Sequence, residues 1–253
     1  MILKVMSFNL RVEGEGDGIN NFPNRRENIL RAIRESDPDL IGFQEATDLI
    51  KGFLRQELSD TYVILGCGRT RHSRGESACL AYRRDLFELI SFETFWLSSE
   101  PGVPGSRYGG SDQSPFPRIT VHAELSPAGM DETIHFFNTH LDHEGKQARV
   151  LGMTQIMQRV AACRGKFVLT GDMNALPDAP EIQVAKSLSS RTVREATESL
   201  SLTFHGYGRI QENCKIDYIF TDGEPSGAYA LPDEHPDGIY ISDHFPVCAK
   251  IEF

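Results

Sequence analysis

The sequence has few cysteines, a single tryptophan, no basic excess and no long apolar run. Its five cysteines, at positions 67, 79, 163, 214 and 248, are odd in number and form no Cys-x-x-Cys pair. This pattern argues against a disulfide framework or a structural zinc site, and it predicts a protein of the reducing cytoplasm. No stretch approaches the roughly 18 apolar residues that span a bilayer, and no basic leader precedes an apolar block. We therefore expect neither membrane insertion nor secretion.

The charge balance is acidic. Lys and Arg number 26 and Asp and Glu number 36, so the net charge is −10. Proteins that hold nucleic acid through its phosphates usually carry a basic excess, so tight non-specific binding to DNA or RNA is disfavoured. Carboxylates gathered around a metal ion would also raise the acidic count. The 253 residues, 40% of them hydrophobic, are typical of globular chains, and we expect one domain over 1–253.

Strand and helix patterns are mixed along the chain. Apolar or alternating runs predict strands at 3–9, 39–44, 62–65, 77–82, 88–96, 119–125, 134–140, 167–169, 215–221 and 245–253. Helical patterns begin near residue 24, with Asn24 and Glu27 as a capping box, and recur at 49–58 and 145–162. The runs 40–43 and 167–169 are apolar on both faces and need cover on both sides. We therefore expect an α+β fold of two stacked sheets with helices outside.

Several strands end in polar residues. Asn9, Glu45 and His140 follow apolar runs, Asp172 and Asn174 follow another, Asp217 interrupts the run 216–220, and Asp243 and His244 precede the last strand. An acid in or beside an apolar strand is costly unless it is paired or bound to a metal. Taken singly, each residue fits a turn, a helix start or a core histidine. Together, the four acids predict a hard divalent cation with oxygen ligands.

In this combination the sequence resembles the endonuclease/exonuclease/phosphatase superfamily. The matching motifs, in order, are MSFNLR, DPDLIGFQEA, NTHLDH, LTGDMNALPD, KIDYIF and SDHFPV. They span nearly the whole chain and are most similar to the compact bacterial branch, with some likeness to deadenylase-type domains. The resemblance implies a four-layer αββα sandwich with its site at one rim.

The resemblance also implies roles for the matching residues. Glu45 would be the principal ligand of Mg²⁺, with Mn²⁺ as an alternative, and Asp243 would lie beside the metal. Asn9 would hold the metal environment or the scissile phosphate, and His140 would donate to a phosphate oxygen. Asn174 would help to hold the attacking water or the phosphate.

Two further implied roles concern Asp217 and the general base. Asp217 would hydrogen-bond to His244 and fix its tautomer. Asp172 would orient or deprotonate the attacking water, and either Asp172 or His244 would serve as the base. Such a hydrolysis needs no nucleophilic side chain, which agrees with the absence of a Gly-x-Ser-x-Gly elbow.

The sequence departs from some members of the superfamily. Certain nucleases carry an acid where this chain has Arg11, so one dominant metal is expected and Arg11 is a candidate phosphate ligand. The inositol phosphatases have a tryptophan before the Gly-Asp motif and a Cys-Asp-Arg pattern near the second Asp. Here Val168 and Leu169 precede Gly171, and the second pattern is absent around Asp217, which disfavours that subgroup.

Several weaker candidates each have two interpretations. Arg118 is either a phosphate ligand or a surface arginine. Asp142, with its neighbours His143 and Arg149, either lines the pocket or caps the next helix. His205 is a candidate substrate contact. Trp96 is expected to pack in the core, and the Gly- and Pro-rich loop at 101–117 to border the site mouth.

The sequence thus predicts a Mg²⁺-dependent phosphoesterase that hydrolyses a mono- or diester through an activated water. The alternatives are a nuclease acting on DNA or RNA and, from another class, a non-catalytic phosphate-binding module. The expected partner is a phosphorylated small molecule or nucleic acid as substrate, with no membrane and no obligate protein partner.

Overall fold

The strands form two six-stranded mixed sheets within the residues that the computed structural model describes, 1–232 and 238–253. Sheet A contains, in order across the sheet, β11 (Glu224–Ala230), β12 (Val247–Glu252), β1 (Ile2–Asn9), β2 (Leu40–Ala46), β4 (Ser77–Arg83) and β3 (Tyr62–Leu65). Sheet B contains β5 (Phe87–Trp96), β6 (Ile119–Pro127), β7 (Ile134–His140), β8 (Lys166–Asp172), β10 (Asp217–Thr221) and β9 (Arg194–Glu195).

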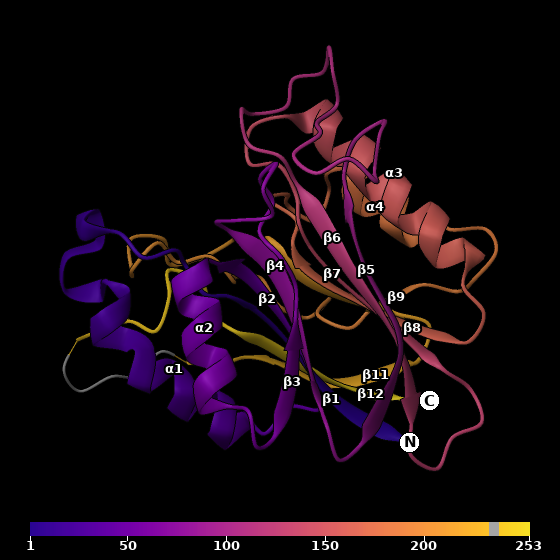
Figure 1. Ribbon diagram of the computed structural model, residues 1–253, viewed down its shortest axis with the longest axis horizontal. Helices are drawn as coiled ribbons and strands as arrows, with labels where there is room; N and C mark the ends of the chain where they lie inside the picture. Colours follow the sequence, from indigo (N-terminus) through magenta and orange to yellow (C-terminus); the bar gives the residue numbers. More distant parts are fainter. Residues whose placement is uncertain (233–237) are drawn as a thin grey trace.

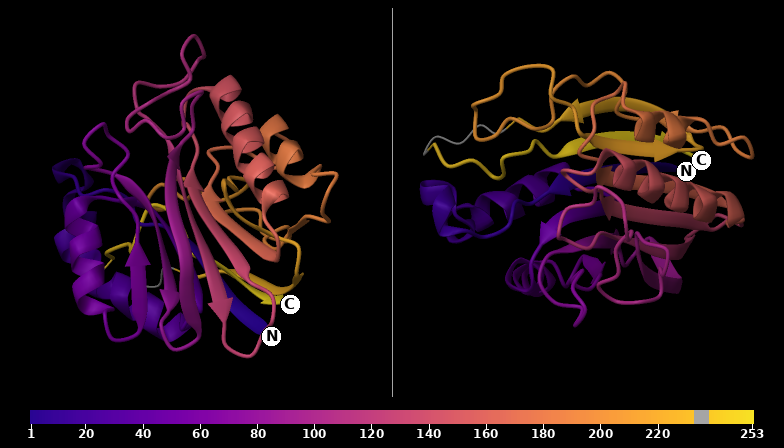
Figure 2. Two further views of the ribbon diagram at one scale, coloured as in Figure 1. Left: turned by 45° about the vertical axis from the view of Figure 1, so that its right-hand side comes forward. Right: turned by 90° about the horizontal axis from the view of Figure 1, so that it is seen from above.

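The helices lie on the outer faces of the two sheets (Figures 1 and 2). The short 3-10 helix η1 (Glu15–Asn20) leads into α1 (Phe22–Ser36), which covers sheet A together with α2 (Asp48–Glu57). The helices α3 (Lys146–Ala162) and α4 (Pro180–Lys186) cover sheet B. The expected α+β sandwich of four layers is confirmed. Among the described residues, no helix combines the length and the hydropathy that a bilayer crossing requires.

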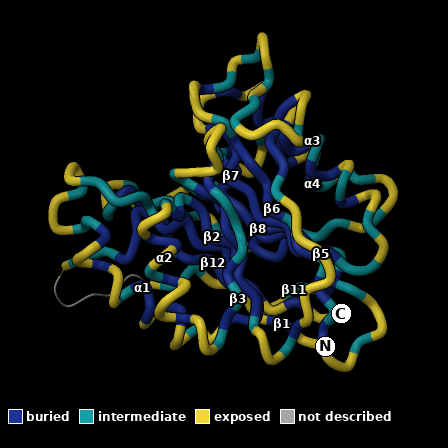
Figure 3. Tube along the Cα trace, viewed as in Figure 1, coloured by how far each residue is buried: buried dark blue, intermediate teal, exposed yellow. Residues whose placement is uncertain are grey.

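The two sheets pack face to face through a shared apolar core. Val5 and Leu40 of sheet A meet Val121, Val168 and Ile219 of sheet B, and all five are buried. Burying each such side chain contributes roughly 1.5–3 kcal/mol. Both faces of β2 and β8 are covered, as their doubly apolar sequences require, and Figure 3 shows these central strands as buried.

A buried polar network joins the two sheets where they come closest. A Cβ at Gly42 would lie 1.9 Å from Thr170 Oγ1 and 2.4 Å from Asn138 Oδ1, so only glycine fits there. Asn138 Nδ2 donates to the carbonyl oxygens of Phe43 at 2.8 Å and Cys79 at 2.7 Å, and Gln44 Nε2 donates to Asn138 Oδ1 at 2.7 Å. This network fixes β2 against β7 just before the strands end.

The expected start of the first helix is wrong. Helix α1 begins at Phe22, and Asn21 is its N-cap, with Oδ1 accepting from the Phe22 amide at 2.8 Å. Asn24 lies inside the helix, so it forms no capping box with Glu27. Pro23 explains the difference, because proline lacks an amide hydrogen and suits the first turn of a helix.

Two differences concern the C-terminal strands. β11 was not expected, because its sequence contains Pro225 and Gly227 and resembles a loop; it forms as an exposed edge strand with a register shift between Ser226 and Tyr229. The strand expected at 215–221 begins two residues later, so Asp217 opens β10 and does not interrupt an apolar run.

Candidate active site

The site forms where the central strands of both sheets end. The pairs β1–β2 and β7–β8 are parallel, so their carboxyl ends meet at one edge of the sandwich, where ligands of such sheets commonly bind. The register of sheet B places His140 beside Asp172, and Asp172 beside Asp217, in one row across three strands. Residues far apart in the sequence are thereby brought together.

A pocket of about 530 Å³ opens at this edge, and we call it the site pocket. It is lined by Arg11, Val12, Glu45, Arg69, Glu76, Phe116, Arg118, His140, His143, Asp172, Asn174, Phe204, Ile216, Asp243 and His244. Two other predicted site residues, Asn9 and Asp217, are buried and contact residues of this lining.

Asn9 links the carboxylates of the two sheets. Its Nδ2 donates to Glu45 Oε1 at 3.1 Å and to Asp172 Oδ2 at 2.9 Å. The other Glu45 oxygen accepts from the Val12 amide at 2.9 Å. Asn9 therefore orients both acids, and each keeps lone pairs available for a ligand in the pocket.

Three residues of the site pocket have left-handed backbones. The φ angles are 53° at Arg11, 58° at Glu45 and 48° at Asn174. For residues other than glycine such a conformation costs on the order of 1–3 kcal/mol, and it persists only where surrounding contacts impose it. Here the Asn174 amide donates to Asp172 Oδ1 at 2.9 Å, and Glu45 lies in the irregular stretch of β2 between Phe43 and Ala46.

Asp217 and His244 form a buried hydrogen-bonded pair. The distance from His244 Nδ1 to Asp217 Oδ2 is 2.9 Å, and the other ring nitrogen lies 3.8 Å from Asp172 Oδ2. Burial disfavours the imidazolium, but Asp217 outweighs it and raises the pKa of His244 to about 10. His244 is therefore a charged donor at neutral pH.

His140 has the opposite electrostatic character. Burial and the nearby Arg118 guanidinium lower the pKa of His140 to about 3, so its ring is neutral. Its Nε2 lies 3.4 Å from Asp172 Oδ2 and its Nδ1 lies 3.3 Å from Glu76 Oε1. Burial raises the pKa of Asp172, the acid between the two histidines.

Arg69 and Arg118 also line the site pocket, and both lie near Glu76. Arg69 Nη1 contacts Glu76 Oε1 at 2.6 Å, and Arg118 lies 3.8 Å from the same oxygen. Arg118 Nη2 also contacts His143 Nδ1 at 2.8 Å. The sequence pointed to Arg118 and His143 but not to Arg69 or Glu76, which lie between β3 and β4 in a segment without a motif.

Asp142 and Arg149 lie outside the site pocket lining. Asp142 accepts from the Ser114 amide at 3.1 Å and the Gly145 amide at 2.8 Å, and its Oδ2 lies 3.5 Å from Arg118 Nε. Burial raises the pKa of Asp142, but the Ser114 hydroxyl and these amides outweigh it and lower the pKa to about 2. Asp142 therefore holds Arg118 and the turn before α3. Arg149 forms a buried ion pair with Glu181.

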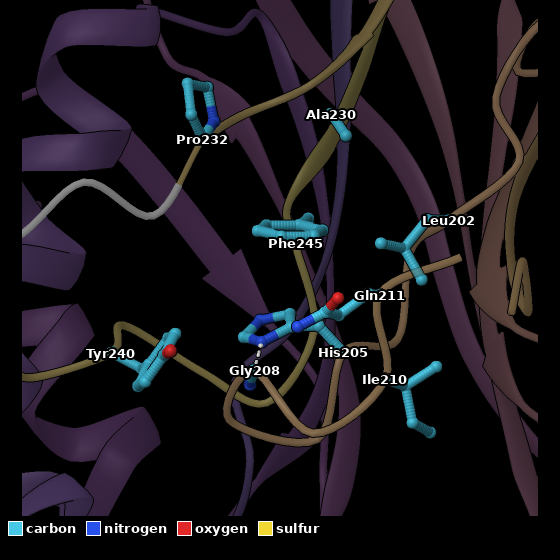
Figure 4. A pocket seen from close by; sticks show the side chains of 9 residues that line it. All are labelled: Leu202, His205, Gly208, Ile210, Gln211, Ala230, Pro232, Tyr240 and Phe245. Carbon is cyan, nitrogen blue, oxygen red and sulfur yellow. Dashed lines mark hydrogen bonds between the residues drawn. The ribbon is translucent and has the colours of Figure 1, made fainter.

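His205 lies in a second pocket, of about 560 Å³, behind the strand bridge between Phe204 and His244. Figure 4 shows its ring beside Phe245, on which it stacks at 4.2 Å between centroids, with Tyr240 nearby. Its Nδ1 accepts from the Gly208 amide at 3.1 Å. The structure therefore does not bring His205 into the site pocket.

The loop at 101–117 reaches the site pocket through one residue. Phe116 lines the pocket, and the Arg69 guanidinium lies over its ring at 5.0 Å from the centroid. Trp96 is buried beside Ala78 and Ile119, and its Nε1 donates to the Arg69 carbonyl oxygen at 2.7 Å. Trp96 thus packs in the core and supports Arg69 from behind.

The donor set of the site pocket fits a divalent cation. Glu45, Asp172 and Asp243 supply carboxylate oxygens, which hard cations such as Mg²⁺ prefer. Burial raises the pKa of Asp243, and the like charge of Glu45 raises it further, whereas the nearby His244 lowers it. A cation between Glu45 and Asp243 would relieve the repulsion between these two acids. Ligand atoms of Asp172, Asp217 and His244 also lie within 4.8 Å of one another, but two of these side chains are already hydrogen-bonded together.

Comparison with known proteins agrees with this geometry. The family model of the Endonuclease/Exonuclease/phosphatase family matches residues 6–244. The chain belongs to this family. Its members typically hydrolyse phosphate esters with a divalent metal ion. Membership therefore supports this general activity, and no particular substrate, for the chain.

Three solved structures illustrate the range of similar proteins. A Bacteroides vulgatus member of the family is 27% identical, with a TM-score of 0.91, and the alignment covers 100% of this chain and 99% of that one. The mannosyl-6-phosphatase of Bacteroides thetaiotaomicron is 26% identical, with a TM-score of 0.88 and coverages of 99% and 100%. TDP2 of D. rerio, complexed with a single-stranded DNA product, is 15% identical, with a TM-score of 0.78 and coverages of 100% and 99%, and shares the fold.

Proposed function

We propose that this chain is a metal-dependent phosphatase that hydrolyses a phosphate monoester of a small molecule. The observation that carries the proposal is the mixed charge of the site pocket lining. The carboxylates of Glu45, Asp172 and Asp243 and the guanidinium groups of Arg69 and Arg118 line the same pocket. A terminal phosphate has enough charge and enough free oxygens to contact a cation and both arginines at once.

In this proposal Glu45 and Asp243 would hold Mg²⁺, or Mn²⁺ in its place. The cation would neutralise the charge that develops on the phosphate. Asp172 accepts the proton of the attacking water, since burial raises its pKa and Asn174 and Asn9 hold both of its oxygens in place. Asn9 also keeps Glu45 in position.

The two histidines have separate roles in the proposal. His244 donates to a phosphate oxygen from Nε2, because Asp217 keeps Nδ1 protonated and the ring charged. A charged ring has no lone pair, which favours Asp172 over His244 as the base. His140 is neutral and donates a second hydrogen bond to the phosphate from its Nε2, which also lies near Asp172.

The similarity to a mannosyl-6-phosphatase supports a small phosphorylated substrate, such as a sugar phosphate. The net charge of −10 supports it as well, because a long polyanion would be repelled. The second candidate is a nuclease; the shared fold of TDP2 with bound DNA product favours it at the level of fold alone. We place the enzyme in a reducing compartment, since its five cysteines are free in the described structure.

A substrate screen tests the proposal. Sugar phosphates, dinucleotides and oligonucleotides would be incubated with Mg²⁺ or Mn²⁺, each with an EDTA control and with the Glu45→Gln variant. We expect metal-dependent phosphate release from a monoester, and loss of that release in the variant. Cleavage of oligonucleotides alone would establish the nuclease, and phosphate binding without turnover of any substrate would establish a non-catalytic module.

A further inference from the structure

A second cluster of metal-binding side chains lies on the outer face of sheet B. His122 of β6 and His135 of β7 face each other, with 3.0 Å between His122 Nε2 and His135 Nδ1. Cys163, the C-cap residue directly after α3, lies beside them, and one ligand atom from each of the three lies within 4.8 Å of the others. His135 is near the start of β7, whereas His140 ends it, so roughly 16 Å of strand separates this cluster from the site pocket.

The outward nitrogens of both rings have fixed acceptors. His122 Nδ1 lies 3.3 Å from Glu93 Oε1, and His135 Nε2 contacts the Arg164 carbonyl oxygen. Both acceptors are oxygens without a proton to give, so both outward nitrogens carry the hydrogen. Arg159 Nη1 contacts the same Glu93 oxygen at 2.8 Å and holds it in place.

This assignment leaves the inward nitrogens in conflict. A neutral imidazole has one protonated nitrogen, so His122 Nε2 and His135 Nδ1 would both present lone pairs to each other at 3.0 Å. Two lone pairs at that distance repel. The repulsion is removed when one ring turns its hydrogen inward, which gives up an outward hydrogen bond, or when a metal ion lies between the two nitrogens.

The surroundings match those of metal-bound histidines. Such histidines usually donate their second ring nitrogen to a carboxylate or a backbone carbonyl, and this pair has one of each, from Glu93 and Arg164. The carboxyl end of α3 also favours a bound cation, because the helix dipole places partial negative charge there. Cys163 supplies a soft third donor, and its thiol donates to the Arg159 carbonyl oxygen at 3.2 Å in the metal-free arrangement.

We propose that His122, His135 and Cys163 form a Zn²⁺ site that ties β6 and β7 to the end of α3. Two imidazole nitrogens and a thiolate suit Zn²⁺ and do not suit Mg²⁺, so this site differs in metal from the site pocket. Three protein donors leave one tetrahedral position for water.

The protons and charges balance for this exchange. Without metal, two neutral rings hold two protons and the thiol holds one. With Zn²⁺ bound, both ring protons lie on the outward nitrogens and the thiol has become a thiolate, so the ion and its three ligands carry a net charge of +1. Binding therefore releases one proton to solvent from a partly buried cluster.

Cobalt titration of the metal-free full-length chain tests the site, with Mg²⁺ in excess to occupy the site pocket. Co²⁺ replaces Zn²⁺ at such sites, and a thiolate ligand gives it a sulfur-to-metal absorption band that oxygen ligands do not give. We expect one equivalent of Co²⁺ to produce the band and one equivalent of Zn²⁺ to remove it. The Cys163→Ser variant should lose the band, whereas Cys214→Ser, which removes a thiol elsewhere, should keep it.

Two further measurements distinguish loss of the metal site from misfolding of a variant. The conservative His122→Gln variant should weaken Co²⁺ binding at least tenfold, and circular dichroism should show that both it and Cys163→Ser keep the native fold. Zn²⁺ should raise the Tm of the unaltered chain and of Cys214→Ser, but not that of Cys163→Ser. Absence of the thiolate band in the unaltered chain, or its persistence in Cys163→Ser, would overturn the proposal.

Discussion

Replacing Asp217 by Asn removes one charge from the proposed site with little change in shape. The new amide oxygen can accept from His244 Nδ1 as Asp217 Oδ2 does, at 2.9 Å. The amide nitrogen then takes the place of Asp217 Oδ1, which has no hydrogen-bond partner among the described residues. The variant therefore keeps the tautomer of His244 and loses the electrostatic support for its charge.

The loss is large because the pair is buried. At an effective dielectric constant of about 20, opposite charges 2.9 Å apart attract by roughly 6 kcal/mol. That corresponds to about four pKa units. Without it the pKa of His244 falls from about 10 to the ordinary histidine value or below, since burial then dominates. His244 becomes neutral at pH 8 and no longer donates as an imidazolium.

Turnover should report this loss. Removing one preorganised donor to a transition state typically lowers kcat by about 10²–10³, and we expect a loss of that size at pH 8 in Asp217→Asn. Activity should recover in part as the pH falls and His244 regains its proton. The control is Asp39→Asn, a buried acid that contacts the Lys4 amide away from the site pocket, and it should keep normal turnover.

An NMR titration of the metal-free protein would measure the histidine directly. The His244 ring should stay protonated up to pH 8 in the unaltered chain and titrate near or below pH 6.5 in Asp217→Asn. Full activity with an unchanged pH profile in a folded Asp217→Asn variant would refute the reasoning. So would a neutral His244 at pH 7 in the unaltered chain.

Three further changes give distinct outcomes. Glu45→Gln should weaken Mg²⁺ binding at least tenfold in calorimetry, and equal affinity would contradict its assignment as the main ligand. Gly42→Ala should lower the free energy of unfolding by about 2–3 kcal/mol in urea, because the new Cβ would overlap Thr170 and Asn138. A free energy of unfolding within roughly 0.5 kcal/mol of that of the unaltered chain, the range of surface substitutions, would contradict this. Asp142, with its pKa lowered from 3.8 to about 2, stabilises the fold above pH 3.8 and loses that contribution as the pH falls toward 2. Asp142→Asn should therefore be less stable at pH 7 by about 1.5–3 kcal/mol but show a shallower acid dependence, and an unchanged pH slope would argue against the shift.

The sequence predicted the strand ends well because each is marked by a change from apolar to polar residues. Glu45, His140 and Asp172 lie at the ends of their strands, and the parallel pairing of β1–β2 and β7–β8 brings them to one edge. The alternation of side chains fixes which face is buried, and the register then follows from the core. These strand ends are therefore local properties that a pattern can reveal, whereas the edge strand β11 carries no such pattern.

Arg69 and Glu76 of the site pocket could not be predicted in the same way. Arg69 and Glu76 lie between two strands, in a segment whose shape depends on tertiary contacts. A Cβ at Gly68 would lie 2.1 Å from the Arg74 backbone. Arg69 is held by Glu76 and by the Trp96 indole, which donates to the Arg69 carbonyl oxygen. None of these contacts leaves a periodic signal in the sequence.

The zinc proposal contradicts the expectation from the cysteine spacing that the chain has no zinc site. The sequence contains no Cys-x-x-Cys spacing, which counted against a structural metal. The proposed ligands His122, His135 and Cys163 come from three elements and meet only because β6 pairs with β7 and α3 ends above them. Spacing rules describe sites built within one loop, whereas a site built across a sheet depends on register.

The polar network behind the site accounts for the left-handed backbone at Glu45. Gln44, the preceding residue, is anchored through Asn138 to sheet B, and the Val12 amide holds the Glu45 carboxylate itself. A conformation that costs on the order of 1–3 kcal/mol persists only where surrounding contacts impose it, as these two hydrogen bonds do here. Loosening the network should let Glu45 relax to an ordinary strand conformation, which would turn its carboxylate away from Asn9. The inter-sheet hydrogen bonds of Asn138 therefore serve the geometry of the proposed metal ligand as well as the stability of the sandwich.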